Sequence, residues 1–511
     1  MAHSQPVADG AIFGGWFDVE DGRQILGDLA LARADTRLYL HDREFFYVAG
    51  EKRRFLTGVL HDLRRVTLTG LNSISDLGSH HGRSGNFHYS ELSPQQVLVG
   101  EEHIDPTVPS ISKISFAIDD AFALFHDTDA FGLALDPRAA IRDVVQSTAE
   151  LVGHGIATGE NPLIAYFAGR RDIVSADTAI GRVSVDHYPL VHPFEGPSGA
   201  AIRNQILVQL DCTGPLPLSA ALDHVMALLR FFELMGGRPQ NLDQLRVAKS
   251  GAGRPAWLDV YWCRKPARSS DWQQEQVQPI EVLEDPIRHR EQYEGLLRQW
   301  IATDYERMPA RVRFSGGFQQ QRHFPIDRLV GAANMFDILP KSAVPPPPSI
   351  NADVQAARKA ADAAFRSLPD SEDRQSVLGA LKRIGTVTLR RKIEHRANLV
   401  SSALKNPLPH LDAVVAEAVR CRNYFVHGTP GNFDYFEHMD LTIFMAKALE
   451  FLFAASDLID AGWDISRWRS RGNVLSHVFS RTLYAWDISA PRIAEFRAKP
   501  ERGSSDSSPL R

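Results

Sequence analysis

The chain is poor in cysteine and contains no long apolar run, and these two shortages narrow its class. Its three cysteines, Cys212, Cys263 and Cys421, lie far apart among 511 residues and form no CxxC pair. Neither a disulfide framework nor a cysteine-ligated zinc site is indicated. No uninterrupted apolar run reaches about 18 residues, and the N-terminus has no secretory signal pattern. We therefore expect a protein of the reducing cytoplasm without a membrane span.

Common catalytic motifs are also missing. The sequence has no GxxxxGK[ST] loop, no HExxH and no GxSxG, so P-loop NTPase, zincin and α/β-hydrolase functions have no support. A net charge of -5 provides no global attraction to nucleic acid, and any polyanion site must be a local basic patch. His80, His81 and His88 have no carboxylate or cysteine at ligand spacing, so we expect a surface loop there. No metal and no cofactor are expected.

The first 280 residues are typical of a β-rich domain. Segments such as RRVTLTGL, SISKISFAI and NQILVQLDC are short, rich in β-branched residues and separated by Gly, Pro, Asp and Ser. One helix, ALDHVMALLRFFELMGG, ends on a pair of glycines. We expect a sandwich-like β-rich domain over residues 1–280.

The remainder changes to a helical period. Apolar residues recur at i, i+3, i+4 and i+7 in seven segments from about residue 281 onward. We expect an α+β, two-domain protein with an all-helical domain at 281–475, interrupted by a proline-rich loop at 343–350. Residues 476–511 are expected to form a C-terminal extension with a disordered tail.

One of these helices carries an unusual arginine. In LDAVVAEAVRCRNYFVH the apolar stripe contains Val414, Ala418 and Cys421, and Arg422 falls about 20° from its centre. A buried guanidinium needs a carboxylate, backbone carbonyls, a phosphate or another subunit as partner. His427 ends the segment, and Gly428 supplies the left-handed stop.

The spacing between this arginine and this histidine is not distinctive by itself. Arg-x4-His occurs four times: at Arg83 and His88, Arg182 and His187, Arg390 and His395, and Arg422 and His427. Only the last combines an arginine on an apolar stripe, a polar neighbour in Asn423 and a histidine at a glycine-terminated helix end. On a straight helix Arg422 and His427 would point about 140° apart, so one copy does not obviously assemble a site.

The segment RNYFVHG resembles the R-[polar]-x3-H signature of HEPN domains. More broadly, nearly the whole chain resembles the ApeA-like anti-phage proteins, which join a β-rich N-terminal domain to a HEPN domain. GGWF, LGDL, RRVTLTGL and VLVGEEHI look like landmarks of that N-terminal domain. LLRQWIA, RLVGAANMF, TLRRKIEHRANLV, the motif helix and LIDAGWD follow the order of the HEPN helices.

The resemblance implies a metal-independent endoribonuclease that causes abortive infection. It assigns acid/base catalysis to His427, transition-state charge to Arg422 and positioning to Asn423. Cleavage by the 2′-hydroxyl of RNA needs a group that titrates near neutrality and a fixed positive charge, and histidine and arginine meet these needs. The implied partners are an RNA substrate such as tRNA, a phage-derived trigger at the N-terminal domain, and a second copy bound through the motif helix.

Other basic residues are candidate RNA contacts. A run between residues 382 and 396 could follow an RNA backbone, although most such runs are solvated helix faces. The RNA-binding candidates are Lys382, Arg383, Arg390, Arg391, Lys392, Arg396 and Tyr424. Trp468, in ISRWRSRGN, could stack on a base, but a packed tryptophan flanked by surface arginines is the expected arrangement.

Two alternatives remain open at this point. The chain could be a catalytically inactive HEPN module for binding or assembly, with the β-rich domain as its recognition surface. It could also be the partner of a nucleotidyltransferase, in which case Tyr424 would be adenylylated. If Arg422 and His427 were only structural, the arginine would pair with a core carboxylate and the histidine would cap carbonyls.

Overall fold

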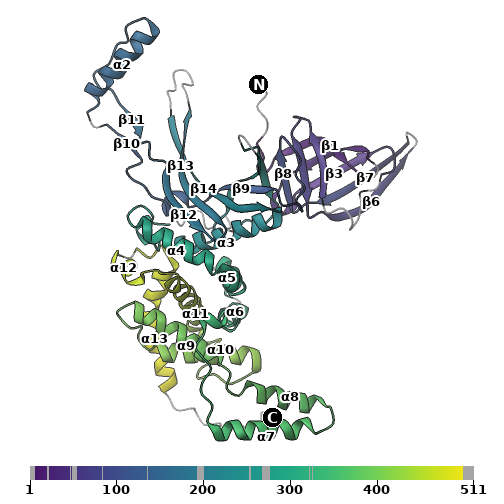
Figure 1. Cartoon of the computed structure of the whole chain (residues 1–511), viewed down its shortest axis with the longest axis vertical. Helices are drawn as coiled ribbons and strands as arrows, with labels where there is room; N and C mark the ends of the chain where they lie inside the picture. The colour runs from purple at the N-terminus through teal and green to yellow at the C-terminus, as the bar shows by residue number, and fades with distance from the viewer. Residues whose placement is uncertain are drawn as a thin grey trace, which may run out of the picture. The chain divides into compact units, whose positions relative to one another are not determined.

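The computed structural model describes residues 6–19, 22–46, 48, 55–82, 85–134, 136–192, 201–251, 255–267, 277–320, 323–324, 326–472 and 474–498. Contacts divide the chain into two compact units (Figure 1). The first unit comprises Met1–Gly236 and Gln240–Ile301, and the second comprises Gly237–Pro239 and Ala302–Arg511. The expected tail at 499–511 lies outside the described residues.

A 14-stranded antiparallel sheet dominates the described part of the first unit. Its strands are β1 (Ile12–Asp18), β2 (Gln24–Ala30), β3 (Arg37–Asp42), β4 (Phe55–Leu60), β5 (Arg65–Thr69), β6 (Asn72–Gly82), β7 (Gly85–Ser93), β8 (Gln96–Gly100), β9 (Ile111–Ile118), β12 (Asp172–Thr178), β13 (Gly181–His192), β14 (Ala201–Leu216), β15 (Leu242–Lys249) and β16 (Trp257–Trp262). The spatial order is β12-β13-β14-β9-β15-β16-β8-β5-β4-β1-β2-β3-β7-β6.

The β-rich character of the first unit is confirmed, but its strands form one continuous sheet where two separate sheets would make a sandwich. Alternate residues of β1 and β2 are buried, including Phe13, Phe17, Ile25 and Leu29, as expected for strands with one face toward a core. The buried faces of β1 to β5, β7 and β8 meet in a single hydrophobic cluster. This end of the sheet therefore has a hydrophobic core of its own.

Helices accompany the other end of the sheet. The expected long helix is α3 (Leu218–Gly236), which is buried along most of its length and packs against β9 and the short α1 (Ala121–Leu124). It ends where Gly237 has a φ of +69°, a value that glycine adopts without strain. The sequence analysis missed α2 (Arg138–Val152), which has no buried residue and is carried by the small hairpin of β10 (Phe131–Leu133) and β11 (Ala165–Phe167).

The second unit is helical throughout its described elements, as expected. Its helices are α5 (Asp304–Gln319), α6 (Ile326–Asp337), α7 (Ala352–Arg366), α8 (Glu372–Arg383), α9 (Leu389–Ala403), α10 (Leu411–His427), α11 (Met439–Asp460), α12 (Ile465–Ser470) and α13 (Val478–Ala498). The preceding helix, α4 (Arg290–Ala302), groups with the first unit. The prolines after the 3-10 turn at Lys341–Ala343 lie in a non-helical connection to α7.

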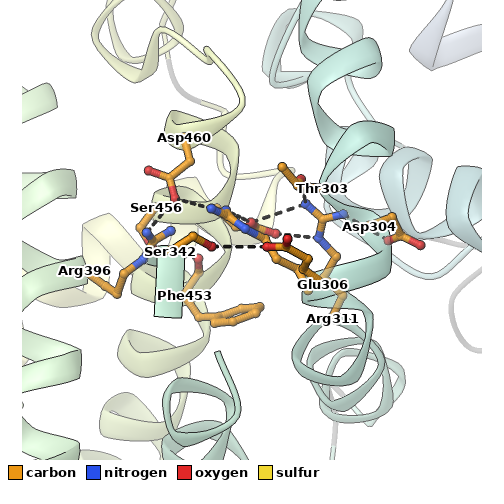
Figure 2. A network of polar contacts seen from close by, with 11 residues as sticks. Thr303, Asp304, Glu306, Arg311, Ser342, Arg396, Phe453, Ser456 and Asp460 are labelled. Carbon is orange, nitrogen blue, oxygen red and sulfur yellow. Dashed lines mark hydrogen bonds and ion pairs between the residues drawn. The ribbon is translucent and has the colours of Figure 1, made fainter. Parts of the chain in front are cut away.

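Helix α11 forms the centre of this unit, because α6, α9, α10 and α13 all pack against it. It also supplies the acids of a buried ionic network (Figure 2). Asp457 accepts from Arg307 and Arg311 of α5, and Asp460 accepts from Arg307 at 2.8 Å and from Arg396 of α9 at 2.6 Å. Burial alone would raise the pKa of Asp457, but the two arginines hold it below its ordinary value.

None of the described helices is long and apolar enough to cross a membrane.

Candidate functional site

Helix α10 has the architecture that its sequence predicts. Val414, Val415, Ala418 and Cys421 are buried against the neighbouring helices, and they recur with the helical period. The helix ends at His427 because Gly428 adopts a left-handed φ of +72° and donates its N–H to the carbonyl of Tyr424 at 2.8 Å. The motif residues therefore lie on the last two turns, where side chains can reach past the helix end.

Arg422 is half-buried and makes three contacts at this end. Its Nη1 donates to Oδ1 of Asn423 at 3.1 Å and lies 3.3 Å from Nε2 of His427, and its Nη2 donates to Oδ1 of Asn334 at 3.3 Å. The Nε atom is buried and has no hydrogen-bond partner in the described part of the chain. Asn334 belongs to α6, so two helices hold the guanidinium.

The contact between Arg422 and His427 corrects the expectation that the two side chains diverge within one copy. The angle of about 140° describes only the directions in which the side chains leave a straight helix. Arginine has a long flexible stem, and His427 is the last residue of α10. The guanidinium therefore reaches along the helix to the imidazole, and one chain brings the motif residues together.

The contact between Arg422 and His427 determines which ring nitrogen of a neutral His427 carries the proton. A guanidinium can only donate hydrogen bonds, so Nε2 of His427 must accept. An accepting Nε2 carries no proton, which leaves the proton of a neutral imidazole on Nδ1. The exposed His427 is then arranged as a base, with a cation beside it.

The electrostatics of Arg422 are unusual for a half-buried arginine. Its hydrogen-bond partners are two side-chain amides and an imidazole. In the described part of the chain it has no carboxylate within ion-pair distance, whereas Arg328 of the neighbouring α6 binds both oxygens of Glu450 at 2.7 Å. A cation held by neutral dipoles keeps its full charge for an incoming anion. Such an arrangement suits a phosphate better than it suits a structural ion pair.

Two residues that shape this site were not predicted from the sequence. Asn334 could have been found as an isolated amide in the apolar helix RLVGAANMF. Glu417 is fully buried on α10 and accepts from Nδ2 of Asn432 at 2.5 Å, the hydroxyl of Tyr435 at 2.7 Å and Arg497 at 2.8 Å. These bonds anchor the segment that follows His427. Burial and the neighbouring Glu417 raise the pKa of Tyr435, which keeps its hydroxyl protonated as a donor.

The two other Arg-x4-His pairs that lie wholly within the described residues do not form this contact. Arg182 donates to the hydroxyl of Ser175 at 2.9 Å, and Arg390 donates to Glu394 at 2.6 Å. Arg83 lies outside the described residues. Within the described part of the chain, sequence context therefore selected the pair whose side chains meet.

The RNA-binding candidates fall into two groups. Lys382, Arg383, Arg390 and Arg391 are exposed on α8 and α9. Lys392 is half-buried and bonds to Asp337 at 3.1 Å.

Arg396 is buried, and the expectation that it contacts RNA was wrong. Its exposed fraction is 1%, and it donates to Ser456 at 2.9 Å and Asp460 at 2.6 Å, so its charge is neutralised inside the domain (Figure 2). It occurs in the basic run because it follows the helical period of the core: Ile393, Ala397 and Val400 are buried beside it.

Two aromatic candidates differ in surroundings. Tyr424 is half-buried, and its ring packs edge-on against Phe425 at 5.0 Å and Tyr435 at 5.3 Å. Trp468 is buried and packs against Trp463, as expected for a core residue.

The histidine-rich segment is a β-hairpin, and the expectation of a loop there was wrong. His80 and His81 belong to β6 and His88 belongs to β7. His80 stacks on Tyr89, and His88 bonds to Ser79 at 2.7 Å. The described residues contain no group of three or more His, Cys, Asp or Glu side chains that could hold a metal ion.

Comparison with known protein families yields two matches. The family ApeA N-terminal domain 1 matches residues 15–283, and the family Apea-like HEPN matches residues 330–466. The second match includes Asn334 on α6 and the motif residues of α10. Curated proteins and solved structures gave no match.

Proposed function

The chain belongs to the ApeA family, with an ApeA N-terminal domain 1 followed by an Apea-like HEPN domain, and from this we propose that it is an anti-phage endoribonuclease. The helical domain cuts RNA without a metal, and the N-terminal domain restrains cleavage until a phage-derived component binds. Cleavage of cellular RNA, with tRNA as one candidate, then arrests the infected cell. The proposal places the protein in the cytoplasm, where these RNAs occur.

In the proposed reaction the RNA supplies its own nucleophile. When RNA binds, the guanidinium of Arg422 turns from Nε2 of His427 to the phosphate. The freed Nε2 then takes the proton of a 2′-hydroxyl, and the resulting oxygen attacks the adjacent phosphorus. Arg422 stabilises the negative charge of the phosphorane, while Asn423 holds the guanidinium in place. The products are a 2′,3′-cyclic phosphate and a 5′-hydroxyl.

A homodimer would complete this chemistry. One imidazole cannot both accept the 2′-hydroxyl proton and protonate the departing 5′-oxygen on the opposite side in the same step. A second copy related by a two-fold axis would bring a second His427. Val426 is 43% exposed beside the motif, so the end of α10 has apolar surface available for such contact.

The proposal rests on the groups that surround the guanidinium of Arg422. Arg422 is held beside His427 by neutral groups, with no carboxylate within ion-pair distance in the described chain. This favours a phosphate partner over the alternative of a structural arginine. An inactive HEPN module or a nucleotidyltransferase partner would not require a guanidinium and an imidazole in contact.

The test is growth and total RNA integrity in bacteria that express wild type, Arg422→Ala or His427→Ala, with and without phage. We expect RNA fragments with cyclic-phosphate ends from the wild type and from neither motif variant. Arg182→Ala is a matched control, because Arg182 has the same sequence spacing to a histidine but bonds to Ser175; it should cleave like the wild type. If the two motif variants protect against phage as well as the wild type does, the binding-module alternative replaces the nuclease.

A further inference from the structure

The first unit contains a cavity of about 790 Å³. It is formed between the β15–β16 hairpin, the ends of β13 and β14, and residues 6–9 of the N-terminal segment. Pockets for small-molecule ligands occupy about 300–1,000 Å³ and combine apolar walls with a few convergent polar groups. The size of the cavity is therefore that of a small-molecule site.

Two cations on the cavity wall lack the ion pairs of their neighbours. Arg33 pairs with Asp9 at 2.9 Å and Arg246 pairs with Asp259 at 2.8 Å. Arg264 and Lys265 also line the cavity, but in the described part of the chain neither has a carboxylate within ion-pair distance. They follow one another directly after β16, so two adjacent positive charges have no ion-pair partner in the described part of the chain, although the carboxylate of Asp243 also lines the cavity.

Arg264 is the more constrained of the two. It is half-buried, its guanidinium carbon lies 4.6 Å from the ring centroid of Trp262, and its Nη1 lies 3.3 Å from the sulfur of Met226. Burial lowers the pKa of Arg264, and Glu233 opposes this only from beyond ion-pair distance. The tryptophan ring and the thioether orient the guanidinium without neutralising it, which leaves its charge for an anion.

Other residues of the cavity lining offer groups suited to a nucleobase. Tyr188 and Gln205 are directly paired across β13 and β14, and both line the cavity. Tyr188 is 46% exposed, and its ring can stack on a planar ligand. Gln205, Asn241 and Gln244 also line the cavity, and an amide side chain can both donate to and accept from the edge of a base.

We propose that this cavity binds a nucleotide, with its phosphate at Arg264 and Lys265 and its base against Tyr188 and the amides. The binding site stands independently of the ribonuclease reaction. Its use as the switch that controls RNA cleavage rests on the proposed function.

Binding is tested on the full-length His427→Ala chain by titration calorimetry with AMP, adenosine and inorganic phosphate as probes. We expect AMP to bind roughly tenfold or more tightly than adenosine, because adenosine cannot use the charged hydrogen bonds. Phosphate alone should bind more weakly than AMP, since it leaves the aromatic and amide wall empty. AMP binding no tighter than adenosine, or no AMP binding at millimolar concentration, overturns the proposal.

Two variants assign the phosphate position. Arg264→Met keeps an unbranched stem without the charge and should weaken AMP binding roughly tenfold or more. Arg246 lines the same cavity but is already paired with Asp259. The substitution Arg246→Met should therefore change AMP affinity little. Lys265→Ala, at an exposed position, provides a second test if Arg264→Met has a lowered thermal midpoint. Wild-type AMP affinity in both Arg264→Met and Lys265→Ala would refute the assignment.

Because calorimetry measures binding in a chain without its motif histidine, the result does not depend on RNA cleavage. A loss of AMP binding with intact RNA cleavage in the Arg264→Met chain that retains His427 would refute control of cleavage by nucleotide. Absence of RNA cleavage in the wild type, with normal AMP binding, would instead refute the proposed function alone.

Discussion

Arg422 differs from three other arginines of the helical domain in the groups that surround its charge. Arg307, Arg311 and Arg396 are buried and bind Asp457 or Asp460 (Figure 2). Arg422 is held by Asn334, Asn423 and His427. Each of the three buried arginines is paired with an acid from α11, whereas the neighbours of Arg422 are neutral dipoles.

The difference separates two uses of the same residue type. A buried arginine whose charge is cancelled cross-links helices and has no charge left for a ligand. An arginine among neutral groups keeps that charge at the cost of an uncompensated desolvation. The comparison predicts that loss of a network residue should impair folding, whereas changes at Arg422 should impair chemistry.

The role of the ion-paired arginines is tested by Asp457→Ala. This change leaves Arg307 and Arg311 buried without their shared carboxylate, and breaking a buried pair in this way costs about 3–5 kcal/mol. We expect the free energy of unfolding of the helical domain, measured by urea titration, to fall by this amount. Asp362→Ala is the control, because it removes an exposed ion pair with Arg366 on α7; an equal loss from both would contradict the distinction.

Asn334→Asp tests the role of the unneutralised charge at the site itself. It keeps the shape of the side chain and gives Arg422 the carboxylate that it lacks, converting it into an ion-paired arginine. A charged hydrogen bond contributes about 1.5–3 kcal/mol, so RNA cleavage should fall roughly tenfold or more as the carboxylate competes with phosphate. The measurement is the initial rate on a labelled RNA, with Asn334→Gln as the neutral control. Undiminished cleavage by Asn334→Asp would show that free charge on Arg422 is not needed.

The network also predicts how stability depends on pH. The pKa of Asp457 is held low in the folded state, so the unfolded chain binds a proton there more readily. The contribution of Asp457 is therefore present above the unfolded value of about 3.9 and is lost as pH falls through the lower folded value. We expect the difference in unfolding free energy between the wild type and Asp457→Ala to be constant from pH 7 to 5 and to shrink below about pH 4. A difference that stayed constant down to pH 3 would contradict this.

The sequence predicted much of the fold because local periodicity carries it. Each of α6 to α11 follows the apolar repeat of its own residues, and the turn at Gly428 follows from a single glycine. Helix α2 was missed because it lies within a strand-rich stretch, between β10 and β11. Lack of burial does not explain the miss, because α7 was predicted and has no buried residue either. The join of all fourteen strands into one sheet depends on pairing between distant segments, such as Arg65 of β5 with Gly100 of β8, which no local pattern encodes.

The sequence identified the cation and the imidazole of the site, but it did not predict that the two side chains are in contact. A helical wheel places Arg422 and His427 far apart because it ignores side-chain length. It also cannot show that Asn334 from α6 completes the surroundings of the guanidinium. Arg396 was mistaken for an RNA contact because a basic run looks the same whether its charges face water or an acid 64 residues away.

Arg390→Ala and Arg391→Ala test whether the distinction between neutralised and free charge extends to the surface, and their effects should be smaller than those above. Arg390 and Arg391 are adjacent and exposed on α9, but Arg390 pairs with Glu394 at 2.6 Å. If RNA passes this surface, Arg391→Ala should reduce the slope of log affinity against log salt by about 0.7, the value for one lost phosphate contact with single-stranded RNA. Arg390→Ala should change the slope less, because Glu394 already offsets part of its charge. Filter binding of an RNA oligonucleotide to both variants, in a His427→Ala background, measures the two slopes. Equal reductions would mean that exposed pairs open freely to RNA, and that neutralisation controls arginine function only where water is excluded.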